Sequence, residues 1–195
     1  MEYETVKSII KGRQSLFAQQ MAENKTIEEG VIRELLELAN YAPSHRRTEP
    51  WRFTVFQKAA KHDFYNTLAA IYKLTSSEIS FNPQKEQRIL GKAKNVSTVI
   101  AICMNRCSKK SVPVFEEQWA VACAVQNMLL GMKSLKIIGY WSTPKMAFTE
   151  EMKAYLKLNN EEQCMGFLQI GLPKEGLPHI PQKTNGSMAD KVTWR

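Results

Sequence analysis

Apolar positions recur along this 195-residue chain at two periods, which predict helices interleaved with strands. Spacings of three and four residues predict helices over residues 6–12, 26–41, 58–74, 83–94, 114–136 and 150–158. Runs rich in β-branched and aromatic residues predict strands over residues 51–57, 96–104, 137–142 and 164–170. The longest helix, over residues 114–136, should be the central helix of the molecule.

Two of these helices carry more detailed expectations. Thr26 stands three residues before Glu29, which is the spacing of a capping box at a helix start. The central helix should turn one apolar face inward, formed by Ala120, Cys123, Ala124, Met128 and Leu135.

The chain after Gly171 has no helical periodicity and contains Pro173, Pro178 and Pro181. A segment this long without a core of its own is either disordered or wrapped on another surface. Its last residues, 192–194, are β-prone and aromatic, which fits a strand docking on another surface.

Length and composition favour one soluble domain spanning residues 1–195. Hydrophobic residues make up 44% of the chain, enough for one substantial core. The longest apolar run, over residues 96–104, is about half of the roughly 20 residues that span a bilayer, so no membrane partner is expected. Because the first residues lack a secretory signal pattern, the default compartment is the cytoplasm.

The formal net charge is +8, but the basic residues are spread along the chain in short runs. This distribution does not favour nucleic acid as a partner, and it equally suits a smaller anion such as a phosphate-bearing cofactor. Four cysteines are scattered at positions without zinc-site spacing, so we expect free thiols and no metal. The chain also lacks dinucleotide-binding, P-loop, nucleophile-elbow and zinc-hydrolase motifs.

Three polar segments lie where predicted elements end. Arg13-Gln14-Ser15 follows the first helix, and an arginine fork with a neighbouring hydroxyl suits a phosphate as well as a solvated helix end. The loop over residues 41–51 contains Tyr41 and His45 and precedes an aromatic strand, a place where binding groups are often mounted. The segment over residues 139–144 could offer backbone amides and an indole to a planar ligand, or simply bury its tryptophan.

Together these segments resemble the nitroreductase family, in order and in separation. The matching stretches are Gly12–Ser15, Ala42–His45, Pro50–Phe53, Ala124–Leu130, Gly139–Trp141 and Gly166–Pro173. The resemblance implies an α+β fold with a central, mainly antiparallel sheet flanked by helices. It also implies an intertwined homodimer with FMN at the subunit interface and an exchanged C-terminal tail over residues 172–195.

The resemblance also assigns the cofactor-binding residues. Arg13 and Ser15, with Gln14 beside them, match the residues that hold the FMN phosphate. Tyr41 lies in the loop whose His45 matches a contact to the flavin from the partner subunit.

Trp141, Ser142 and Thr143 match the segment against the isoalloxazine ring, where a backbone N–H commonly meets N5. The chain departs from the family pattern at two positions. Many relatives have glycine where this chain has Pro144, which has no N–H, so Thr143 or a neighbour must supply that donor. Close relatives have a second arginine where this chain has Gln14, and we expect a basic residue of the tail, Lys183, to compensate.

For such a protein the chemistry belongs to the cofactor, and no catalytic side chain is expected. The resemblance implies ping-pong hydride transfer from NADH or NADPH to a small acceptor such as a nitroaromatic or quinone. Two alternatives stay open: a specialised flavin enzyme of the same family, such as a dehydrogenase, a dehalogenase or a flavin-fragmenting enzyme, and a non-enzymatic basic binding module.

Overall fold

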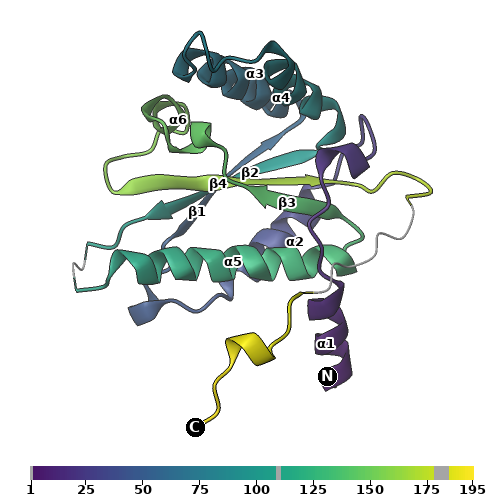
Figure 1. Cartoon of the computed structure of the whole chain (residues 1–195), viewed down its shortest axis with the longest axis vertical. Coiled ribbons are helices and arrows are strands. Elements are labelled where there is room, and N and C mark those ends of the chain that lie inside the picture. Colours follow the sequence, from purple (N-terminus) through teal and green to yellow (C-terminus); the bar gives the residue numbers. More distant parts are fainter. Residues whose placement is uncertain (1, 109–110, 178–184) are drawn as a thin grey trace.

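The computed structural model describes residues 2–108, 111–177 and 185–195, and it shows a layered α+β molecule (Figure 1). Its helices are α1 (Tyr3–Gly12), α2 (Glu29–Asn40), α3 (Lys58–Thr75), α4 (Pro83–Asn95), α5 (Val114–Ser134) and α6 (Glu150–Tyr155). Its strands are β1 (Trp51–Gln57), β2 (Thr98–Asn105), β3 (Ile138–Ser142) and β4 (Glu162–Gly171). These bounds confirm the helices and strands predicted from the sequence to within a few residues, and β1 matches its predicted range at both ends.

Among the described residues the strands form one antiparallel sheet in the order β1-β2-β4-β3. Thr98 of β2 pairs with Ile170 of β4, and Gly139 of β3 pairs with the same residue from the other side. The β2–β4 register shifts between Ile102 and Cys103, where a bulge interrupts the ladder. The sheet is therefore antiparallel throughout, as predicted.

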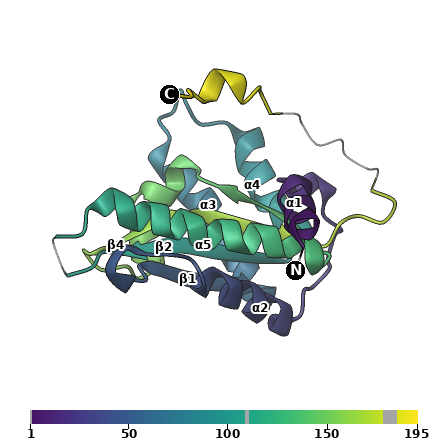
Figure 2. The same cartoon turned by 90° about the horizontal axis from the view of Figure 1, so that it is seen from below.

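Helices cover both faces of this sheet and give it two cores. Successive residues of β2 point alternately to opposite faces, and seven of its eight residues are buried. Val99, Ala101 and Cys103 pack with α3, α4 and α6 on one face. The other face packs against α2 and α5, and Figure 2 shows α5 lying along it with α2 beside it.

Two detailed expectations are wrong. The N-cap of α2 is Glu28 and makes no side-chain capping bond, so Thr26 forms no capping box; the backbone N–H of Ile27 instead donates to Ser97 Oγ at 2.7 Å. Cys123 is exposed on α5 because it faces away from the sheet, although all four cysteines are free thiols as predicted. In the single chain residues 192–194 form no strand and follow a 3₁₀ helix, Ala189–Lys191, so their docking on another surface stays a prediction.

The start of the tail is held by backbone contacts beside the segment that follows α1. Ala22 donates its N–H to the Leu172 carbonyl at 2.8 Å, and Lys174 donates to Gln20 at 3.0 Å. The described end of the chain is exposed and stands apart from the sheet (Figure 1), with Trp194 91% exposed. No helix within the described ranges is long and apolar enough to cross a bilayer.

Candidate functional site

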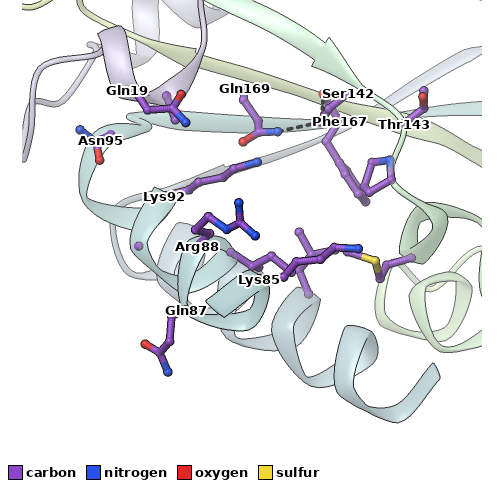
Figure 3. A pocket seen from close by; sticks show the side chains of 16 residues that line it. Gln19, Lys85, Gln87, Arg88, Lys92, Asn95, Ser142, Thr143, Phe167 and Gln169 are labelled. Carbon is purple, nitrogen blue, oxygen red and sulfur yellow. Dashed lines mark hydrogen bonds between the residues drawn. The ribbon is translucent and has the colours of Figure 1, made fainter. Parts of the chain in front are cut away.

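A pocket of about 750 Å³ lies between α4 and the turn that follows β3 (Figure 3). Its walls come mainly from the 3₁₀ helix Ala18–Gln20, helix α4, the Ser142–Pro144 turn and the buried face of β4, and Leu68 of α3 and Met146 add apolar surface. Ser142 and Thr143, both expected at the site, line the pocket, whereas Gln169 and the cations of α4 were not expected there.

The cations of the pocket lie on one face of α4. Lys85, Arg88 and Lys92 are spaced by three and four residues, so their side chains project from the same side of the helix. None of the described residues that line the pocket is acidic. The pocket therefore favours an anionic or electron-rich ligand.

Lys92 is the most enclosed of these cations. Burial lowers the pKa of its ammonium group, because desolvation disfavours the charged form. Its Nζ lies 5.8 Å from the centroid of the Tyr140 ring. A bound anion would offset this desolvation, so Lys92 is suited to a ligand that carries negative charge.

A buried chain of hydrogen bonds reaches the opposite wall of the pocket. Tyr65 and Tyr140 both donate to Gln169 Oε1, at 2.8 and 2.9 Å. Gln169 Nε2 then donates to Ser142 Oγ at 2.7 Å, and Ser142 Oγ donates to the carbonyl of Phe167 at 3.3 Å. The Ser142 hydroxyl is thereby oriented by residues from three different elements.

Trp141 lies beside the pocket and depends on a glycine for its position. Its Nε1 donates to the Met165 carbonyl at 3.0 Å. Gly166 has a φ of +116°, and a Cβ atom there would come within 2.7 Å of Trp141 Nε1 and 2.5 Å of the Ser142 carbonyl oxygen. Both the backbone conformation and the close approach therefore require glycine at position 166.

The segment expected to hold a phosphate, Arg13-Gln14-Ser15, lies outside the pocket lining. Arg13 ends α1 as its C-cap, and its Nη1 donates to Ser15 Oγ at 3.5 Å, with Gln14 half-buried between them. Leu16 donates its backbone N–H to Gly139 at 3.2 Å, which ties the segment to β3. The chain then continues into Ala18 and Gln19 at the pocket wall, so the segment after α1 leads directly into the pocket lining.

Tyr41 and His45 lie on the opposite face of the sheet, with α2 and α5. Tyr41 is 77% exposed beside a second, largely apolar hollow of about 640 Å³ between α2 and α5. His45 Nδ1 contacts Glu116 Oε2 at the start of α5. The same loop contains Arg46, Arg47 and Glu49 in left-handed backbone conformations, which are costly for residues with a side chain. A single chain does not bring this loop to the pocket, and Lys183 lies outside the described residues.

Comparison with known proteins identifies the family. The sequence model of the nitroreductase family matches residues 10–172, which is most of the chain. The chain belongs to the nitroreductase family. Its relative YfhC of Bacillus subtilis, named as a candidate NAD(P)H nitroreductase, is 25% identical over 184 residues, covering 94% of this chain and 91% of the relative.

Solved structures of the nitroreductase family confirm the fold. A nitroreductase-like protein from Bacillus cereus superposes with a TM-score of 0.82 at 18% identity, covering 100% of this chain and 98% of that one. The FMN-dependent nitroreductase NfnB from Mycobacterium smegmatis, solved in complex with NADPH, superposes with a TM-score of 0.75 at 13% identity, covering 98% of each chain. These similarities establish the nitroreductase-like fold predicted from the sequence.

Sequence reasoning missed Arg88, Lys92 and Gln169. A basic residue at every third or fourth position of a helix was visible in the sequence, but such a face is most often solvated. Gln169 was also visible as an isolated polar residue within the apolar run of residues 167–170. An amide in a buried strand must find hydrogen-bond partners, and this was the available signal.

Proposed function

We propose that this protein is an FMN-dependent oxidoreductase that transfers hydride from NADH or NADPH to a small acceptor such as a nitroaromatic or a quinone. The observation that carries the proposal is the pocket between α4 and β3, in a chain of the nitroreductase family, with three cations and no acid among its described lining residues. The similarity to NfnB, an FMN-dependent nitroreductase solved with NADPH, supports both the cofactor and the electron donor.

The described residues fit FMN at both ends of the ligand. Arg13, Gln14 and Ser15 would hold the phosphate, since an arginine fork and a hydroxyl together suit its oxygens. The ring system would lie against Trp141, Ser142 and Thr143, with Phe167 providing apolar surface. Thr143 carries the first backbone N–H beyond the last paired strand residue, and Pro144 has none, so Thr143 is the donor we assign to N5.

FMN, when bound, supplies the hydride chemistry, accepting hydride from the nicotinamide and delivering it to the acceptor. The protein's part is to bind, to orient and to limit access. No acid–base pair is required of Ser142 or Gln169, whose side chains are hydrogen-bonded to each other. Because one open pocket would serve donor and acceptor in turn, we propose a ping-pong cycle.

A homodimer would bring together the expected site residues that lie on opposite faces of the sheet in a single chain. Large apolar side chains are exposed on α1, α2 and α5, including Val6, Leu38, Phe115 and the 61% exposed Trp119. Association through this face would let Tyr41 and His45 of one subunit approach the pocket of the other. β1 is an edge strand of the sheet, where a β-prone tail of a second copy could pair, and Lys183 of that tail would then be available to the phosphate.

The experiment that tests the proposal identifies the cofactor and then the kinetic pattern. Purified protein should be yellow, and the ligand released by denaturation should co-migrate with FMN on chromatography. Initial rates at several fixed concentrations of a quinone, with NADH or NADPH varied, should give parallel double-reciprocal lines. FAD as the main species, or no flavin after reconstitution with FMN, would contradict the cofactor assignment, and intersecting lines would contradict the shared pocket.

A further inference from the structure

Gln169 is a polar side chain buried near the end of β4, where only 3% of it is exposed. Its carbonyl oxygen accepts from two hydroxyls, one from Tyr65 on α3 and one from Tyr140 on β3. An amide oxygen has two lone pairs, so both acceptor positions of Gln169 Oε1 are occupied.

Both hydroxyls are donors at neutral pH. Burial raises the pKa of Tyr140 to about 12, although its bond to Gln169 acts in the opposite direction. Burial, and secondarily the neighbouring Tyr140, raises the pKa of Tyr65 well above 10. A protonated hydroxyl can donate to an amide oxygen, and in this network both hydroxyls donate to Oε1, so the NH₂ group lies on the side of Ser142.

This arrangement has a consequence at the pocket wall. Gln169 Nε2 points toward Ser142 Oγ, as Figure 3 shows, and one of its two hydrogens is used there. The other has no partner among the described residues, while Gln169 itself lines the pocket. With its oxygen occupied by the two tyrosines, Gln169 therefore presents an N–H donor at the wall formed by β4.

We propose that Gln169 is a positioning residue of the ligand pocket, held by Tyr65 and Tyr140 so that it orients the Ser142 hydroxyl and offers an N–H to an acceptor atom of the bound ring system. This inference rests on the proposed binding of FMN. A donor facing a ring acceptor binds the reduced ring more tightly than the oxidised ring, because reduction adds electron density to the ring. The Gln169 network, Tyr65–Gln169–Tyr140–Ser142, thus contributes to the reduction potential as well as to affinity.

Gln169→Met tests the donor, since methionine has similar length and no N–H. One neutral hydrogen bond corresponds to a change of about fivefold in affinity. We expect the dissociation constant of FMN, measured by fluorescence quenching on the apoprotein, to rise by about that factor. Because the donor should favour the reduced ring, the reduced form should lose more affinity than the oxidised form, and a further fivefold loss would lower the midpoint potential by about 20 mV for this two-electron couple.

The paired variant Tyr65→Phe/Tyr140→Phe tests the positioning. It keeps Gln169 but removes both donors to Oε1, so the amide is free to turn its oxygen toward Ser142. FMN affinity should fall as far as in Gln169→Met, whereas each single phenylalanine variant should lose less. Tyr155→Phe is the matched control, because the Tyr155 hydroxyl bonds to Thr67 and its ring stacks on Phe56, away from the pocket.

The triple variant Tyr65→Phe/Tyr140→Phe/Gln169→Met separates positioning from stability. Removing all partners of a buried network together can be nearly neutral for folding, so the apoprotein should regain most of the thermal stability lost in the other variants. FMN affinity should stay about fivefold weaker than in the wild type. Recovery of affinity together with stability would show that the network is only structural, and would overturn the inference.

Wild-type binding is measured first, which keeps the two proposals distinguishable. A wild-type protein that binds no FMN overturns the proposed function and this inference together. A wild-type protein that binds FMN, with Gln169→Met and the triple variant binding equally well, overturns this inference alone.

Discussion

Arg13 is the residue on which the phosphate assignment depends most. Within the described chain its guanidinium makes one long side-chain hydrogen bond, to the Ser15 hydroxyl at 3.5 Å, so most of the donors of its planar fork can serve a ligand. A charge-assisted contact contributes about 1.5–3 kcal/mol. Arg13→Ala should therefore raise the dissociation constant of FMN by roughly tenfold to a hundredfold, measured by titration of the apoprotein.

Riboflavin is the control for that substitution because it lacks the phosphate. It should bind the wild type and Arg13→Ala almost equally, whereas a folding defect would weaken both ligands. Arg13→Lys should recover only part of the loss, since an ammonium keeps the charge without the paired geometry. FMN binding to Arg13→Ala within twofold of the wild type would mean that the phosphate lies elsewhere.

Individual site residues could be predicted only where the sequence carries a local pattern. Ser142 and Thr143 could be placed because they follow a recognisable strand in a familiar segment, and the structure puts both at the pocket. Lys92 and Gln169 could not be placed in this way. The role of Lys92 depends on which side of α4 faces β3, and that of Gln169 depends on two tyrosines from other elements. Such juxtapositions arise from tertiary packing and leave no short-range signal.

At the scale of elements, we expect the cationic face of α4 to lower the thermal stability of the apoprotein and to strengthen FMN binding. Lys92→Gln removes a partly desolvated charge, so the apoprotein should melt at a higher temperature than the wild type. The same change removes a cation from the pocket and should weaken FMN binding by roughly tenfold. Both quantities can be read from thermal melts and FMN titrations of one preparation.

Lys94→Gln is the matched control on the same helix. Lys94 is exposed, pairs with Glu23 at 3.2 Å and does not line the pocket. Lys94→Gln should therefore leave FMN affinity unchanged and should not raise the melting temperature. If Lys92→Gln and Lys94→Gln behave alike in both measurements, the α4 face has no role in ligand binding.

The elements themselves were largely predictable, and the errors have local causes. β1 could be bounded because aromatic and β-branched residues are dense between Pro50 and Lys58. The capping box failed because Ser97, seventy residues away, takes the backbone N–H of Ile27 and the helix begins later. The face of α5 was misjudged at Cys123 because a long helix with apolar residues on most sides does not reveal which stripe meets the sheet.

For the whole molecule, the main expectation is that the tail holds a dimer together. Deleting residues 185–195 removes Met188, Val192 and Trp194, which are exposed apolar side chains in the described chain. Sedimentation equilibrium should show the full chain as a stable dimer and the truncated chain shifted toward monomer, with reduced flavin content. An unchanged dimer with full flavin would show that the tail has no such role.

The strand order also bears on how the molecule is made. β4 is the last strand synthesised, yet it lies between β2 and β3 in the finished sheet. A ribosome adding about 5–20 residues per second needs several seconds to pass from residue 105 to residue 171. During that interval β2, an almost wholly apolar strand, has an open edge that can pair with another nascent chain. We therefore expect soluble yield in a producing cell to respond to growth temperature and to chaperone supply more strongly than the stability of the finished protein would suggest.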